Sequence, residues 1–201
     1  MNLPEPLLPM PEWLSVVLAS ASPRRRELLG LILPSFRVEV PSSETSPRPE
    51  ESPAQYALRA AQGKCREVFQ RKQDCLVIGA DTVVVVEGTI LGKPVDPGDA
   101  ERMLGLLSGR EHQVITGLWV CSLLGEKGLF EVSTVRFGRL GAEEIRRYVA
   151  SGEPMDKAGA YGIQGMAACF VEEVRGSYTN VVGLPVRRLY LVLKELFALL
   201  E

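Results

Sequence analysis

Hydrophobic residues recur along the chain with the period of a helix in some stretches and with the period of a strand in others. These stretches mark the expected helices and strands. Residues 16–29 begin as a short apolar run and continue as a helix that Ser22 is suited to cap and Pro23 to start. Apolar residues at helical spacing predict an amphipathic helix over residues 53–70. The nearly continuous apolar run at 75–80 is typical of a buried central strand, which we expect to stop at 79–82.

The same criteria assign the rest of the chain. The pattern predicts strands at 36–40, 83–86, 89–91, 112–123 and 129–137, helices at 99–107, 142–150 and 186–200, and a hairpin of strands 169–174 and 178–182. Strands and helices mixed in this way indicate one α/β domain, a mixed twisted sheet flanked by helices. We expect this domain to cover residues 16–201, after an N-terminal extension at 1–15.

The stretch 16–29 also carries candidate chemistry. Arg24, Arg25 and Arg26 fall in the first turn of the expected helix, where the helix dipole favours anions. Backbone N–H groups, the hydroxyls of Ser20 and Ser22, and guanidinium groups together suit a phosphate. From these residues alone, a solvated basic turn explains the pattern equally well.

Composition narrows the class of protein. The 201 residues carry a formal net charge of −2, which favours a small anionic ligand over nucleic acid. Four scattered cysteines and a single histidine, His112, suggest neither a zinc site nor a disulfide framework, and reduced cytoplasmic thiols fit best. From this pattern we expect neither a signal peptide nor a membrane span, and we expect His112 to be structural.

The remaining polar residues permit metal-assisted hydrolysis of a polyphosphate. Asp81 lies between two apolar strands, where a carboxylate is costly to bury without partners. Lys64 lies at the edge of the apolar face of its helix, although a lysine there commonly extends into water. With Glu44, Lys93 and the arginines, these residues could hold Mg²⁺, orient water and neutralise phosphate charge.

Five blocks of sequence together carry a resemblance to a known family. They are LASASPRR with Leu28 and Leu29 (18–29), GADTVV (79–84), GKP (92–94), LSGxxHxVxTG (107–117) and EPxDKAGAYGIQG (153–165). In order and spacing they resemble the Maf family, nucleoside triphosphate pyrophosphatases with an ITPase-like α/β fold. The resemblance covers residues 16–197.

The resemblance implies cleavage between the α- and β-phosphates with a divalent cation, Mg²⁺ or Mn²⁺, in a homodimer. It makes Asp81 the catalytic base or metal-associated carboxylate. By similarity, Glu44, Lys64 and Lys93 are catalytic, with Glu44 also a metal ligand, and Arg24, Thr82 and Gln164 mark the branch that prefers dTTP and UTP. From their own chemistry, Ser20, Ser22, Arg25 and Lys157 are the expected phosphate contacts.

Other interpretations stay open beside this one. Thr82 and Gln164 would, without the family, be satisfied by local hydrogen bonds. Asp156 and Lys157 could form an ion pair that sets their loop. The related branch acting on 7-methyl-GTP, and a nucleotide-binding regulator of septum formation and cell division, are the alternative functions.

Overall fold

The computed structural model describes residues 7–42, 45–72 and 74–199. The elements in chain order are β1 (Ser15–Ala19), α1 (Pro23–Gly30), β2 (Arg37–Glu39), α2 (Pro53–Arg71), β3 (Cys75–Val86), β4 (Thr89–Leu91), α3 (Pro97–Leu107), β5 (Glu111–Ser122), β6 (Gly125–Phe137), α4 (Ala142–Ala150), the 3₁₀ helices η1 (Glu153–Asp156), η2 (Ala158–Ala160) and η3 (Met166–Phe170), β7 (Val171–Arg175), α5 (Tyr178–Val182) and α6 (Val186–Ala198). Most of them match the elements predicted from the spacing of apolar residues.

The strands form the mixed sheet that the sequence predicts. Their order is β2-β1-β3-β5-β6-β7, with β4 paired to β3. β1 pairs in parallel with β2 and β3, whereas β3 with β4 and β6 with β7 are antiparallel. The α/β class with a mixed sheet and flanking helices is therefore confirmed.

Contacts divide the chain into two compact units. The first comprises the described residues of Met1–Asp81, Thr116–Glu131 and Gly183–Glu201, and the second comprises Thr82–Ile115 and Val132–Val182. Strands β3, β5 and β6 contribute residues to both units. The boundary at Asp81 separates two neighbouring residues of the expected site, Asp81 and Thr82.

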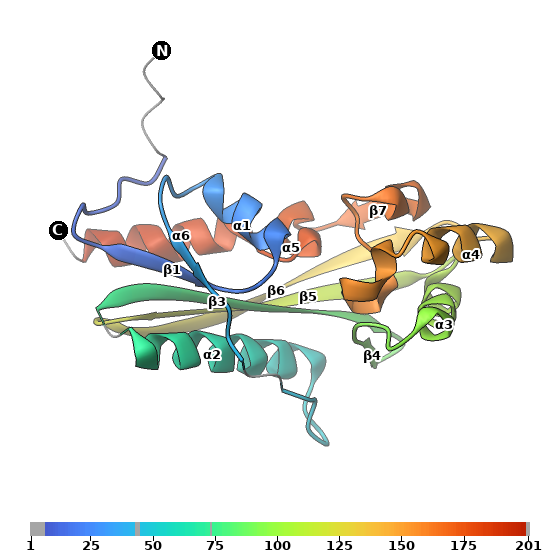
Figure 1. Cartoon of the computed structure of the whole chain (residues 1–201), viewed down its shortest axis with the longest axis horizontal. Helices are drawn as coiled ribbons and strands as arrows, with labels where there is room; N and C mark the ends of the chain where they lie inside the picture. Colours follow the sequence, from blue (N-terminus) through green and yellow to red (C-terminus); the bar gives the residue numbers. More distant parts are fainter. Residues whose placement is uncertain (1–6, 43–44, 73, 200–201) are drawn as a thin grey trace, which may run out of the picture. The chain divides into compact units, whose positions relative to one another are not determined.

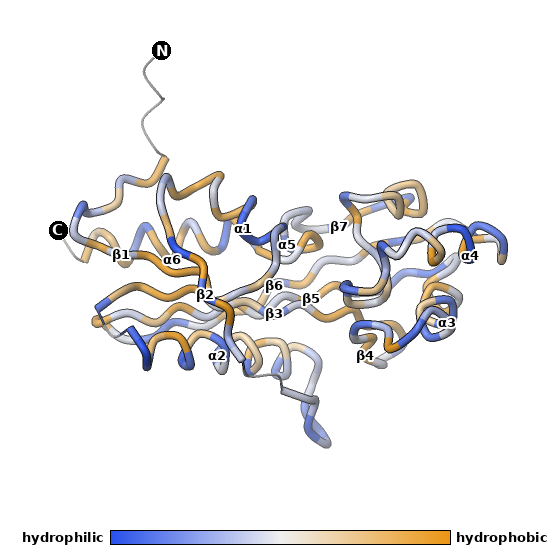
Figure 2. Tube along the Cα trace, in the orientation of Figure 1, coloured by the Kyte–Doolittle hydropathy of each residue, from blue (hydrophilic) through white to orange (hydrophobic). Residues whose placement is uncertain are grey.

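In the first unit, α2 covers one face of the sheet while α1 and α6 cover the other (Figure 1). The strands between them are among the most hydrophobic parts of the chain (Figure 2). Helix α2 approaches very closely at two glycines. A Cβ atom on Gly79 would lie 2.6 Å from the carbonyl oxygen of Ala61, and one on Gly117 would lie 2.2 Å from that of Ala57. Only glycine allows this approach, because neither backbone can give way.

The starts of α1 and α2 follow the predicted capping chemistry. The Ser22 hydroxyl accepts a hydrogen bond from the backbone N–H of Arg25, and Pro23 occupies the first turn. Helix α2 begins with a capping box, in which Ser52 and Gln55 satisfy each other's backbone N–H groups. These side chains satisfy donors that would otherwise lack partners at a helix start.

The second unit is built around a cluster of aromatic side chains. Phe137 on β6 packs edge-on against Tyr161 at 4.7 Å and against Phe170 at 6.1 Å between ring centroids. Tyr148 of α4 packs edge-on against Phe170 at 5.2 Å. Helix α3 packs against α4. This core supports the loops and 3₁₀ helices that follow α4.

Two predicted strand boundaries are wrong. β3 does not stop at residues 79–82 but runs unbroken from Cys75 to Val86, with Asp81 and Thr82 half-buried within it. β6 begins at Gly125, so that the turn after β5 is only Leu123 and Leu124. The Ser122 hydroxyl stabilises this short turn, because it accepts from the Leu124 N–H and donates to the Gly125 carbonyl.

The predicted hairpin near the end of the chain is also wrong. β7 pairs antiparallel with β6, and residues Tyr178–Val182 form helix α5 in place of a strand. The Ser177 hydroxyl accepts from the Asn180 N–H at 3.2 Å, as at a helix start. The buried Asn180 amide donates to the Val114 carbonyl and the Ser133 hydroxyl, which holds the helix in place. No helix in the described part of the chain is long and apolar enough to cross a membrane.

Candidate active site

The turn between β1 and α1 orients the guanidinium group of Arg25. Its Nη1 donates to the hydroxyl of Ser20 at 3.2 Å, and its Nε donates to the carbonyl of Gly183 at 2.8 Å. The Ser20 hydroxyl also accepts from the Ser22 N–H at 3.2 Å. Ser20 is buried, at 4% exposure, so this hydroxyl is a fixed partner. Three of the predicted phosphate-binding residues are therefore joined in one hydrogen-bonded turn.

The electrostatics of this turn favour an anion. The first turn of α1 holds no acidic residue, and the positive end of the helix dipole favours an anion. Burial lowers the pKa of Arg25, while the nearby charge of Asp81 raises it and that of Arg24 lowers it. The guanidinium stays protonated, because arginine does not lose its proton in proteins. Arg26 is exposed, in agreement with its expected place in solvent.

Asp81 forms an ion pair with Lys64, whose Nζ donates to the Oδ1 atom of Asp81. The side chains are 17% and 22% exposed, respectively. Lys64 reaches the strand because the next residue, Cys65, packs directly against Gly79, two positions before Asp81. The pair offsets the cost of placing a carboxylate in a largely buried strand, and it brings together two of the predicted catalytic residues.

Tyr56, one of the residues that sequence reasoning missed, lies near this pair. It is two helical turns before Lys64 on α2, and burial together with the charge of Asp81 raises its pKa. Its hydroxyl donates to the carbonyl of Thr45 at 2.7 Å. The eight-residue spacing between Tyr56 and Lys64 is the sequence pattern that indicates their proximity, because residues at this spacing lie near one face of a helix.

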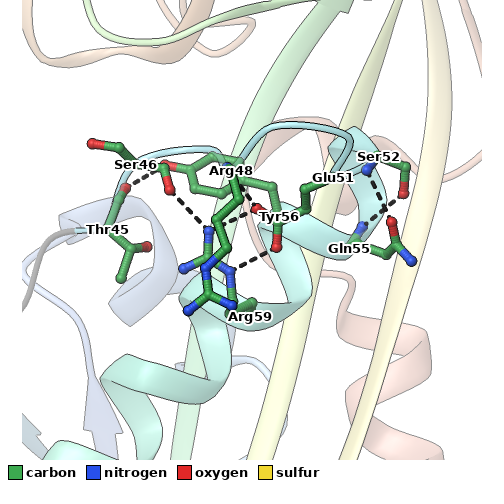
Figure 3. A network of polar contacts seen from close by, with 8 residues as sticks. All are labelled: Thr45, Ser46, Arg48, Glu51, Ser52, Gln55, Tyr56 and Arg59. Carbon is green, nitrogen blue, oxygen red and sulfur yellow. Dashed lines mark hydrogen bonds and ion pairs between the residues drawn. The ribbon is translucent and has the colours of Figure 1, made fainter.

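A network around Arg59 fixes the loop before α2 (Figure 3). Arg59 binds both carboxylate oxygens of Glu51, at 2.6 and 2.7 Å, and donates to the carbonyl of Ser46 at 2.8 Å. Glu51 also accepts from the backbone N–H of Arg48 at 3.0 Å. The hydrogen bond from Arg59 lowers the pKa of Glu51 to about 2. The network attaches residues 45–51 firmly to the helix that carries Lys64.

The predicted metal ligands are described only in part. Glu44 lies outside the described residues. Asp81 is in place, and no cluster of three or more His, Cys, Asp or Glu side chains suited to a metal occurs in the part of the chain that the structure describes. One carboxylate fits Mg²⁺, because this ion is commonly bound by one or two carboxylates with substrate phosphates and water.

In the second unit, Lys157 is held within its own loop. Its Nζ donates to the carbonyl of Glu153 at 2.6 Å and to the carboxylate of Asp156 at 2.7 Å. Its side chain is 13% exposed. The ion pair with Asp156 matches the structural alternative for these two residues, and a phosphate contact by Lys157 stays a prediction.

Of the other predicted residues of the second unit, Lys93 and Gln164 lie on loops and Thr82 lies on β3. The N–H of Gly159 donates to the carbonyl of Gly92 at 2.9 Å, so the segment before Lys93 is tied to the segment after Lys157. Lys93 and Gln164 are exposed, and Thr82 is half-buried on β3. Gln164 lies in the turn closed by the hydrogen bond from the Gly165 N–H to the Gly162 carbonyl, 3.0 Å.

The amino-acid sequence matches one family of known proteins. The family described as Maf-like protein matches residues 15–196. The chain is 49% identical over 183 residues to a protein of Hahella chejuensis, covering 90% of this chain and 91% of that protein. It is 50% identical over 175 residues to one of Symbiobacterium thermophilum, covering 86% and 89%. A protein of Escherichia coli O157:H7 is 46% identical over 188 residues, covering 93% and 95%.

All three relatives are named dTTP/UTP pyrophosphatase. Among solved structures, the Ham1 protein of Staphylococcus aureus aligns with a TM-score of 0.46 and 15% identity, over 61% of this chain and 71% of that one. The family match at residues 15–196 includes every block from which the resemblance was drawn, and the identity to the first of these relatives extends over 90% of the chain. The chain belongs to the Maf-like protein family.

Proposed function

We propose that this protein is a nucleoside triphosphate pyrophosphatase that hydrolyses dTTP and UTP to the monophosphate and pyrophosphate. The observation that carries the proposal is the Asp81–Lys64 ion pair with Arg25 electrostatically coupled to Asp81. The name shared by relatives that are 46–50% identical supports it. A partly buried carboxylate beside oriented cations suits water attack on a polyphosphate.

The residues of the first unit divide the chemistry between them. Asp81 accepts a proton from the attacking water, and the ion pair with Lys64 holds this carboxylate in position. Arg25 donates to phosphate oxygens, and its orientation is set by Ser20 and Gly183. A preoriented donor stabilises developing charge without reorganisation during the reaction.

A divalent cation, Mg²⁺ or Mn²⁺, would be held by Asp81 together with phosphate oxygens of the substrate, and it would neutralise phosphate charge when bound. Glu44 stays the predicted second protein ligand. The preference for pyrimidine nucleotides is assigned to Arg24, Thr82 and Gln164. An amide such as that of Gln164 offers both a donor and an acceptor, as the carbonyl and imide edge of uracil and thymine requires.

A nucleotide panel with product identification tests the proposal. Purified protein is incubated with dTTP, UTP, dGTP and 7-methyl-GTP in the presence of Mg²⁺ or Mn²⁺, and products are separated by ion-exchange chromatography. We expect the monophosphate and pyrophosphate from dTTP and UTP. Release of orthophosphate would reject the cleavage position, and a preference for 7-methyl-GTP would assign the chain to the other branch. A homodimer stays a prediction, which analytical ultracentrifugation tests by measuring the mass of the protein in solution.

A further inference from the structure

The turn that carries Gln164 is held at both ends by one pair of side chains, Glu153 and Tyr148. The Oε2 atom of Glu153 accepts from the backbone N–H of Met166 at 3.0 Å. Its Oε1 atom accepts from the Tyr148 hydroxyl at 2.9 Å, and this hydroxyl accepts from the backbone N–H of Gly162 at 3.4 Å. The two side chains therefore bind the backbone immediately before and after residues 163–165.

Two glycines allow the turn to approach these side chains. A Cβ atom on Gly165 would lie 2.1 Å from Oε1 of Glu153, and one on Gly162 would lie 2.6 Å from Cε of Lys157. Both distances are far below a van der Waals contact. The turn thus lies directly on the Glu153 carboxylate and the Lys157 side chain, and a larger residue at either glycine would force the turn or the side chain beneath it to shift.

Tyr148 connects this contact to the core of the second unit. It is 2% exposed and packs edge-on against Phe170. Burial, followed by the hydrogen bond to Glu153, raises its pKa, so that the hydroxyl keeps its proton and remains a donor. Because the ring is fixed by packing, the hydroxyl gives Glu153 a defined orientation.

We propose that Glu153, oriented by Tyr148, is a positioning residue that sets the nucleotide preference of the enzyme by fixing the turn that carries Gln164. The inference rests on the proposed function and on the assignment of Gln164 to the base. An amide discriminates between bases only when its donor and acceptor are held in a defined orientation. Loosening the turn should weaken this discrimination and spare the chemistry at Asp81, which belongs to the first unit.

The test compares Glu153→Gln with wild-type protein in steady-state kinetics on dTTP, UTP and dGTP. The variant keeps one carbonyl oxygen that can accept from the Met166 N–H. It removes the negative charge and replaces the oxygen that accepts from the Tyr148 hydroxyl by an NH2 group, which can only donate. We expect KM for dTTP to rise about tenfold, kcat to stay within about threefold, and the preference for dTTP over dGTP to fall about tenfold, the effect of losing one hydrogen bond to a charged group.

The matched control is Glu143→Gln on α4. Glu143 forms surface ion pairs with Arg146 and Arg147, and its side chain is 58% exposed. This variant removes one carboxylate from the same region, and its kinetics should equal those of wild-type protein. If Glu153→Gln fails to fold, Tyr148→Phe carries the test, because it removes only the bridging hydroxyl and should shift KM and preference in the same direction.

A double-mutant cycle with Gln164→Ala separates positioning from general stability. If Glu153 acts through Gln164, adding Glu153→Gln to Gln164→Ala should lower kcat/KM for dTTP by less than about twofold. An undiminished effect in that background would overturn the inference, as would an equal fall of kcat on every nucleotide or unchanged preference in an active enzyme. If wild-type protein releases no pyrophosphate from dTTP or UTP, the proposed function fails and this inference with it.

Discussion

Acid should destabilise this protein through its single histidine, His112. The imidazole is 2% exposed and packs edge-on against Phe137 at 4.9 Å and Tyr161 at 5.3 Å between centroids. Its Nε2 lies 2.8 Å from the Tyr161 hydroxyl, while Nδ1 is buried with no hydrogen-bond partner among the described residues. Burial lowers the pKa of His112 from 6.5 to about 4, because no neighbour compensates a charge there.

The sign and size follow from proton linkage. In the unfolded chain, His112 has its ordinary pKa, so between pH 6.5 and about 4 the unfolded state binds more protons than the folded state. The contribution of neutral His112 is complete above pH 6.5 and is lost as pH falls toward 4. At 1.36 kcal/mol per pKa unit, the loss amounts to about 3 kcal/mol. This is a substantial part of the roughly 5–15 kcal/mol that stabilises an ordinary domain.

The assay is urea unfolding at several pH values from 4.5 to 7.5, for wild-type protein and for His112→Gln. Glutamine keeps a polar group for Tyr161 but does not titrate. Carboxylates with lowered pKa, such as Glu51 and Asp99, lose stabilisation mostly below this range and are present in both proteins. We expect the difference in unfolding free energy between the two proteins to shrink as pH falls.

A parallel measurement gives the pKa itself. Because the chain has one histidine, its ring proton resonance in NMR is assigned without further labelling. A folded-state pKa of His112 near 6.5, or a difference in unfolding free energy that does not change with pH, would show that burial of His112 does not cause acid destabilisation.

Four further substitutions probe the site and its support. Asp81→Asn should lower kcat on dTTP by at least about 10³-fold, because the amide cannot accept the proton of water, as measured by pyrophosphate release. Arg25→Ala should lower kcat/KM by about 10²-fold, the effect of losing one oriented donor, whereas Arg26→Ala should stay within about twofold. Gly117→Ala should cost about 3 kcal/mol of unfolding free energy in urea titrations, since its Cβ would lie 2.2 Å from the Ala57 carbonyl oxygen.

Each of these expectations has a matched control variant or a result that would contradict it. Near-normal kcat for Asp81→Asn, in protein with an unchanged melting temperature, would show that its assigned role is wrong. Equal defects in the two arginine variants would contradict the difference between an oriented and an exposed side chain. Gly105 on α3 has no atom within 4 Å of an added Cβ, so Gly105→Ala should instead stabilise by roughly 0.5–1 kcal/mol.

The sequence mispredicts the structure of residues 178–182 and the end of strand β3 for the same physical reason. Tyr178–Val182 contains β-branched and aromatic residues and so was expected as a strand, but the buried contacts of Asn180 stabilise a helix. β3 was expected to stop at Asp81, yet the ion pair with Lys64 allows the strand to continue. In both cases a partner distant in sequence decided the outcome, and local propensity does not contain that partner.

The family, the α/β class, most helix and strand positions, and the capped turn with Ser22 and Arg25 can be predicted from the amino-acid sequence. These features depend on neighbouring residues, on which side chains a helix or strand must bury, or on motifs read in order. The fold was needed to show that Lys64 pairs with Asp81, that Arg59 and Tyr56 fix the preceding loop, and that Glu153 holds the turn with Gln164. Those contacts are set by the close packing of segments far apart in the chain, and no local pattern encodes their geometry.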